Sequence, residues 1–152
     1  MGFTLPPKNT GAGAPEVEDG LALARFDDLQ LREHEKWAGT DQYGNADDGR
    51  RYHFLFTLVD DAHEVMYQDG DPIELESLTR TATGERSNFY ANITGLLDAK
   101  ELAAYNAATA DDPWDGSSLP GTVYNVKIAH NKGGWPFVEQ IIGKAKAPKG
   151  GK

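Results

Sequence analysis

The chain of 152 residues contains no cysteine, which excludes disulfide bonds and cysteine-ligated metal sites. It also lacks any apolar run near the roughly 18 residues that a membrane-spanning helix requires. Residues 1–15 do not contain the apolar stretch of a signal peptide. From these absences we expect a protein that works inside a cell and has no contact with a membrane.

Positive charge is scarce over most of the chain. Residues 1–120 carry nine Lys and Arg against 23 Asp and Glu, whereas residues 121–152 carry six Lys against one Glu. The net charge of −9 therefore conceals a basic C-terminal segment. A uniformly acidic protein repels nucleic acid, but a protein with one basic edge can bind nucleic acid there. The simpler alternative is that the acidic residues only keep the chain soluble.

Motifs for catalysis and metal binding are also missing. The four histidines have neither HxxxH nor HExxH spacing, and the sequence contains no GxxxxGKS or GxSxG motif. Pairs of acids fall at expected bends, where solvated turns explain them better than a glycosidase-like carboxylate pair. Residues 41–48 lack the spacing and the closing glutamate of an EF-hand. We therefore expect a protein that is not an enzyme and holds no metal or other cofactor.

Alternation of apolar and polar residues predicts a mainly β protein with five strands. Asp27 and Asp28 interrupt the first strand and indicate a bulge. A polar stretch over residues 33–49 indicates a long loop before the central strand. Near the C-terminus, residues 131–134 have the composition of a tight hairpin turn. The predicted strands cover residues 21–31, 50–59, 64–80 with an internal turn at 69–72, 121–130 and 135–143.

Helical signals occur once, between the third and fourth strands, so parallel βαβ units do not fit. Ser87 or Asn88 can cap a first helix that stops at Gly95. Asp98, with Glu101 three residues later, predicts a capping box at the start of a second helix. The order of elements predicts a small five-stranded barrel with a helical insert between strands 3 and 4. The expected parts are a flexible N-terminal arm, the barrel domain and a basic tail, at residues 1–19, 20–143 and 144–152.

The segments at residues 20–25, 52–56, 87–96, 119–123 and 137–142 share a loose pattern with a known class of proteins. In these segments the chain resembles the small OB-fold-like single-stranded-DNA-binding proteins of tailed bacteriophages. The resemblance implies an OB-type barrel that holds single strands during replication or recombination, in the cytoplasm of the bacterial host.

Two features depart from that family, whose members often end in an acidic tail. Here the tail is basic and the predicted barrel is acidic. Both keep a second class open, namely a small β-rich phage structural protein, such as a head decoration or tail component, that acts in the virion through protein–protein contacts. A flexible N-terminal arm and a basic tail would suit threading between capsid subunits. The oligomeric state, including a homo-oligomer, is left open.

Aromatic and basic residues in or beside the predicted turns and strands suit single-stranded nucleic acid. Bases stack on exposed rings, at about 1–3 kcal/mol per base, while cations follow the phosphates. The alternative is that the turn aromatics only pack against the protein. The predicted contacts to nucleic acid are the rings of Trp37, Tyr43, Tyr67 and Trp135 and the cations of Arg50, Arg51, Lys127, Lys132, Lys144 and Lys146.

Overall fold

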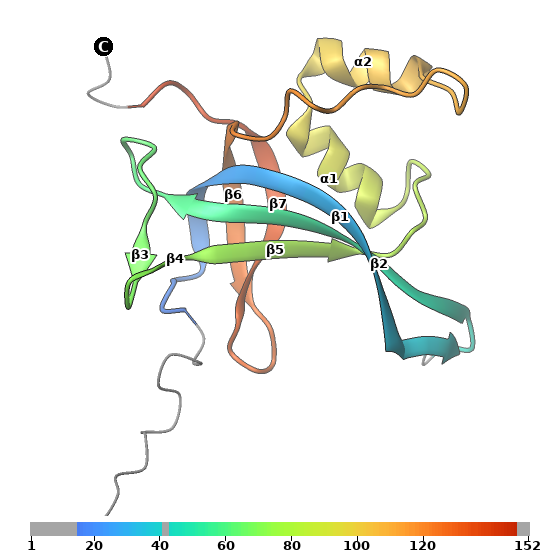
Figure 1. The fold of residues 1–152 in the computed structure, drawn as a ribbon, viewed down its shortest axis with the longest axis horizontal. Helices are drawn as coiled ribbons and strands as arrows, with labels where there is room; N and C mark the ends of the chain where they lie inside the picture. The colour runs from blue at the N-terminus through green and yellow to red at the C-terminus, as the bar shows by residue number, and fades with distance from the viewer. Residues whose placement is uncertain (1–14, 41–42, 149–152) are drawn as a thin grey trace, which may run out of the picture.

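The computed structural model describes residues 15–40 and 43–148, and these form a mainly β structure, as predicted. Most of the predicted N-terminal arm and the end of the basic tail lie outside the described residues. Five strands form one antiparallel sheet in the order β5-β2-β1-β6-β7, and two short strands, β3 and β4, form a second sheet (Figure 1). The strands are β1 (Gly20–Thr40), β2 (Ala46–Val59), β3 (Tyr67–Gln68), β4 (Asp71–Pro72), β5 (Glu74–Thr79), β6 (Val123–His130) and β7 (Pro136–Lys144).

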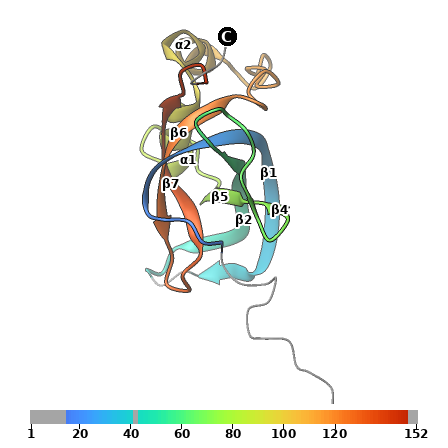
Figure 2. The same ribbon diagram turned by 90° about the vertical axis from the view of Figure 1, so that its left-hand side faces the viewer.

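The five-stranded sheet is open, so the closed barrel expected from the sequence is not what forms. The sheet is strongly curved, with β6 and β7 on one side and β2 on the other (Figure 2). The edge strands β5 and β7 come within 8 Å of each other between Cα atoms, but no hydrogen-bonded ladder joins them. Closure of a barrel requires such a ladder around the whole circumference. β5, which is only six residues long, already pairs with β2 along its length.

The hydrophobic core lies against one face of this sheet, and the alternation within β2 determines which face that is. Phe54 and Phe56 are buried, and the neighbouring strands add Phe26 and Tyr124. The ring of Phe26 meets those of Phe56 and Tyr124 edge to face, with centroids 5.5 and 6.5 Å apart. The bulge predicted in β1 is confirmed, because the pairing moves from Phe26 with Phe56 to Asp28 with Leu55.

Helix α1 (Asn88–Leu96) packs directly against β7. It begins at Ser87, whose hydroxyl accepts a hydrogen bond of 3.1 Å from the Tyr90 N–H. The prediction that Gly95 ends this helix is wrong, since Gly95 is a buried residue inside it. A Cβ atom at this position would lie 2.0 Å from the carbonyl oxygen of Ile141. Glycine is therefore required here for close packing rather than for helix termination.

Helix α2 (Ala99–Ala107) begins with the capping box that the sequence predicts. The Asp98 carboxylate accepts a hydrogen bond of 2.8 Å from the Glu101 N–H, and the Glu101 carboxylate accepts one of 3.0 Å from the Asp98 N–H. No residue of α2 is buried. The helical insert between the third and fourth strands of the five-stranded sheet is confirmed, with α1 as its packed part.

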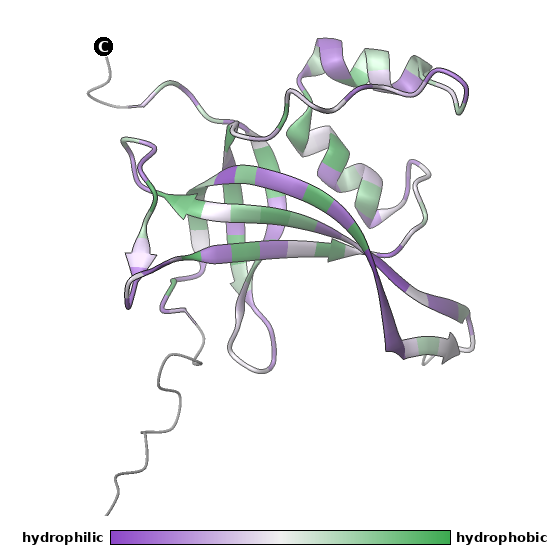
Figure 3. Cartoon of the chain, viewed as in Figure 1, coloured by the Kyte–Doolittle hydropathy of each residue, from purple (hydrophilic) through white to green (hydrophobic). Residues whose placement is uncertain are grey.

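The largest departure from the sequence-based expectation concerns residues 33–49, which were expected to be a long loop. Of these, residues 33–40 and 43–49 form the outer half of the β1–β2 hairpin and project from the sheet (Figure 1). We call residues 33–40 and 43–51 the extended hairpin, which includes Arg50 and Arg51 at its base. Its strands are hydrophilic along most of their length (Figure 3). Because both faces meet solvent, the two strands lack the alternation of apolar residues by which strands are recognised.

Candidate nucleic-acid interface

The β6–β7 turn forms one part of the candidate interface. Its predicted tight geometry is confirmed, because the Asn131 carbonyl accepts a hydrogen bond of 3.0 Å from the Gly134 N–H. The Asn131 side-chain oxygen also accepts a hydrogen bond of 3.0 Å from the Trp135 N–H. Gly134 has a φ of 83°, in the left-handed region that glycine adopts most readily. The turn exposes Lys132 and leaves Trp135 46% exposed.

The extended hairpin forms the other part. In both views it and the β6–β7 turn lie on the lower side of the molecule, with the hairpin at the lower right of Figure 1 and the turn below β6 and β7, while α2 lies on the upper side (Figures 1 and 2). Tyr43 stands at the hairpin tip and is 79% exposed, and Arg50 is exposed on its second strand. Two predicted stacking rings and two predicted cations, from segments far apart in the sequence, therefore share one end of the molecule.

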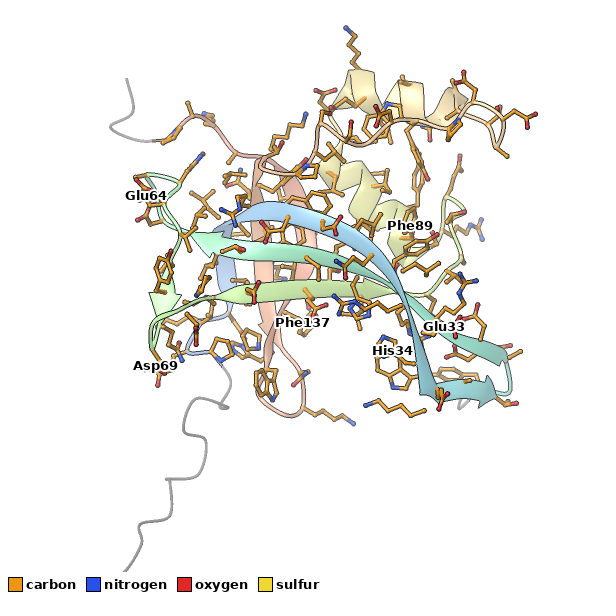
Figure 4. All side chains as sticks on the ribbon, viewed as in Figure 1. Glu33, His34, Glu64, Asp69, Phe89 and Phe137 are labelled. Carbon is orange, nitrogen blue, oxygen red and sulfur yellow. The ribbon has the colours of Figure 1, made fainter. Side chains whose placement is uncertain are left out.

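A wide bulge marks the point where the extended hairpin leaves the sheet. The strand pairing jumps from Glu33 with Arg50 to Ala38 with Asp48, so residues 34–37 lie opposite Gly49 alone. A Cβ atom on Gly49 would lie 2.6 Å from the carbonyl oxygen of His34. Figure 4 shows His34 at this junction.

Trp37, in this bulge, is not the exposed loop residue that the sequence suggested. Its ring is half-buried and lies 4.3 Å from the imidazole of His34 between centroids. The guanidinium of Arg51 lies 4.8 Å from the same ring, and the Lys36 ammonium 5.6 Å from it. These are cation–π distances. The ring of Trp37 is therefore engaged within the protein.

Arg51 is also held by contacts within the protein. Its two terminal nitrogens donate hydrogen bonds of 2.9 and 2.8 Å to the two carboxylate oxygens of Asp47. Arg80 approaches the same carboxylate at 3.1 Å. The hydrogen bonds from Arg51 and from the Gly49 N–H hold the pKa of Asp47 well below its usual range. This ion pair fixes Arg51 beside Trp37 and makes it a poor candidate for direct contact with a phosphate.

A second set of polar contacts lies next to Arg51 and connects three strands. The Nδ1 atom of His53 lies 2.6 Å from a carboxylate oxygen of Glu76 on β5. The Nε2 atom of His53 lies 2.9 Å from the Nε2 atom of His34 on β1. His53 is buried, at 4% exposure. Burial is the main cause that lowers the pKa of His34, and neighbouring positive charges lower it further.

No sequence pattern predicts this set of contacts, because the histidines are scattered along the chain. His53 stands on the polar side of the central strand, and a buried polar residue there requires a partner. That partner, His34, lies in a segment without periodicity, so no pattern connects the two. Within the part of the chain that the structure describes, no three His, Asp or Glu side chains are arranged to hold a metal ion.

The other predicted contact residues lie elsewhere or have intramolecular partners. Tyr67, 63% exposed, lies in the β3–β4 hairpin, at the end of β2 opposite to the extended hairpin. Lys127 pairs with Glu139 at 3.2 Å. Lys146 is exposed in a groove beside the first residues of β1.

Lys144 is bound to the start of α2. Its ammonium lies 2.6 Å from Glu101 and 3.4 Å from Asp98, and these contacts raise the pKa of Lys144. Six of the ten predicted residues lie on the extended hairpin or beside the β6–β7 turn, on the same side of the molecule. These residues are Trp37, Tyr43, Arg50, Arg51, Lys132 and Trp135.

No model of a known protein family matches the chain, and no curated protein matches it. Neither of the helices in the described residues is long and apolar enough to cross a membrane. The function is therefore inferred from the geometry of the two hairpin ends.

Proposed function

We propose that the protein binds single-stranded DNA at the end where the extended hairpin and the β6–β7 turn project. It would act in phage replication or recombination without catalysing a reaction. An OB fold is a five-stranded, partly open barrel that binds oligonucleotides through one sheet face and the loops after its first and fourth strands. The curvature of the sheet, its open edge and the helical insert all suit that fold. The extended hairpin follows the first strand of the five-stranded sheet and the β6–β7 turn follows the fourth, the same order as the two binding loops of an OB fold, and this order supports the proposal.

One observation carries the proposal, namely the pairing of an exposed ring with an exposed cation on each hairpin. Tyr43 and Arg50 are exposed on the extended hairpin, and Trp135 and Lys132 on the β6–β7 turn. A single strand that crosses from one hairpin to the other can place bases on the rings and phosphates near the cations.

The second candidate is a structural protein of a virion. Two large apolar side chains support it, because Leu21 is 79% exposed and Ile142 is 46% exposed. Both lie outside the hairpin ends, on strands that a neighbouring subunit could cover. A net charge of −9 does not oppose such protein–protein contacts.

Fluorescence anisotropy with a labelled oligothymidylate at low salt tests the two candidates. We expect binding that weakens steeply as salt is added, because phosphate contacts release counterions. Trp135→Ala should weaken binding by about 5- to 150-fold, which corresponds to one stacked base. Lys132→Glu, as a separate variant, should also weaken binding, and it should reduce the dependence of binding on salt.

Two matched variants serve as controls. Tyr67→Ala removes an exposed ring from the β3–β4 hairpin, and Lys100→Glu reverses an exposed charge on α2, at the far end of the molecule. Neither should change the affinity by more than about twofold, since neither lies near the proposed path. An affinity that is insensitive to salt, or equal losses in Trp135→Ala and Tyr67→Ala, would refute the proposed path. A complete absence of binding would favour the virion protein.

A further inference from the structure

We infer that His34 and His53 are positioning residues that fix the base of the extended hairpin, and that they do so only while the pair carries at most one extra proton. The observation is the hydrogen-bonded series from Glu76 through His53 to His34, with distances of 2.6 and 2.9 Å. The effect of this series on DNA affinity rests on the proposed function. The effect on the pose of the hairpin does not.

The positions of the protons follow from the chemistry of the acceptors. A carboxylate only accepts, so the Nδ1 atom of His53 carries a hydrogen that it donates to Glu76. The two Nε2 atoms then face each other, and only one of them can carry the hydrogen of their shared bond. With both imidazoles neutral, His34 donates and His53 accepts.

One added proton is compatible with this bond. A cationic His34 can still donate to a neutral His53, or a cationic His53 can donate to a neutral His34, and either bond is charge-assisted. A second added proton places N–H groups opposite each other at 2.9 Å, together with two positive charges. The bond therefore tolerates one added proton, and a second one separates the rings.

Charged groups from three strands determine how readily each proton binds. The carboxylate of Glu76 faces the Nδ1 atom of His53. Positive side chains around His34 oppose the second added proton. The ion pair between Asp47 and Arg51 keeps one of these positive charges in place. The charged groups that act on the pair are Arg32 and Lys36 from β1, Arg51 from β2, which is bound to Asp47, and Glu76 from β5.

Separation of the rings acts directly on the hairpin. Residues 34–37 have no one-to-one partner in the strand pairing, and side-chain contacts connect this bulge to the sheet. One of those contacts joins His34 to His53 and another joins His34 to Trp37. When the hydrogen bond between His34 and His53 breaks, the contact between His34 and Trp37 no longer connects the bulge to the sheet. The extended hairpin, with Tyr43 at its tip, then loses its fixed pose.

Trp37 fluorescence tests the pose in the free protein. The chain has three tryptophans, so a Trp114→Phe, Trp135→Phe background leaves Trp37 as the single emitter. In this background we expect the Trp37 signal to change as the pH falls below about 6, past the usual histidine range. His34→Gln, which retains a donor and an acceptor but cannot titrate, should abolish that change.

His130→Gln is the matched control. It removes another histidine that contacts a carboxylate, that of Asp19, and it should leave the transition in place. A Trp37 signal that does not depend on pH, or the same transition in His34→Gln, would overturn the inference. His53 is buried and its replacement risks unfolding, so the test relies on His34.

Oligothymidylate affinity, measured over the same pH range at constant salt, tests the functional part. General electrostatics predicts tighter binding as the protein gains protons. Once the histidine pair has taken up its second proton, we expect weaker binding instead, with at least a threefold loss of DNA affinity. The His34→Gln variant should not show this loss. Affinity that rises steadily on acidification would overturn this part. A protein that shows the fluorescence transition but binds no DNA at any pH would refute the proposed function and support the inferred pose.

Discussion

Gly95→Ala is the sharpest test of how α1 packs, because helix propensity and tertiary packing predict opposite signs for its effect. Alanine stabilises the interior of a helix over glycine by about 0.8–1.0 kcal/mol. In the folded protein, however, the new Cβ atom would lie 2.0 Å from the Ile141 carbonyl oxygen and 2.7 Å from its carbonyl carbon. Both are backbone atoms, so no side chain can rotate away.

Relief of this contact requires α1 and β7 to move apart by about 1.4 Å, the difference between 2.0 Å and the 3.4 Å at which ordinary contact begins. Such a shift loosens the packing of Phe89, Ile93 and Leu96, all buried on the same helix. Overpacking of a core costs about 1–3 kcal/mol, and the rigid backbone favours the upper end. After the gain in helix propensity is subtracted, we expect a net loss of about 2 kcal/mol.

Urea unfolding at neutral pH, followed by circular dichroism, measures this change. Gly143→Ala is the matched control, because Gly143 lies on β7 and a Cβ atom there has no neighbour within 4 Å. The free energy of unfolding of Gly143→Ala should stay within about 0.5 kcal/mol of that of the wild type. If Gly95→Ala proved as stable as the wild type or more so, α1 would not approach β7 as closely as described.

The remaining predictions concern the core and the base of the extended hairpin. Phe54→Ala should cost about 3–5 kcal/mol in urea unfolding, because it empties a fully buried site, and a loss under 2 kcal/mol would contradict the assigned core. Trp37→Ala should cost about 1–2 kcal/mol through its lost ring and cation–π contacts, and no loss would mean that the bulge is not packed. Asp47→Asn should lower stability at neutral pH. The lowered pKa of Asp47 contributes stability above its unfolded-state value of about 3.9, which is lost as the pH falls, so the variant should flatten the acid side of the stability profile.

Much of the fold follows from local rules that act within a few residues. The alternation in β2 predicted the buried row that includes Phe54 and Phe56. The paired acids predicted the bulge at Asp27, and the composition of the Asn131 turn predicted its geometry. The capping box at Asp98 was equally visible. Each of these features depends on the side chain and on neighbours that sequence spacing already specifies.

Close approach between distant segments could not be predicted in this way. Gly95 has the composition of a helix end, and only the position of the Ile141 backbone shows why glycine is required there. The extended hairpin has no apolar face, so its pairing depends on backbone hydrogen bonds that leave no periodic trace. Barrel closure depends on the separation of two edge strands, β5 and β7, a distance that the order of elements does not specify.

The candidate site also contains some features that the sequence predicts and others that only the tertiary structure decides. Residue type and turn composition identified the exposed side chains of Tyr43, Lys132 and Trp135, since rings and cations in turns tend to stay in solvent. Sequence alone determined a mainly β protein with a basic C-terminal segment and a tight turn before the last strand. Tertiary structure alone decided that the hairpins share one end of the molecule and that His34 meets His53, because both depend on how the sheet curves and on where β1 bulges.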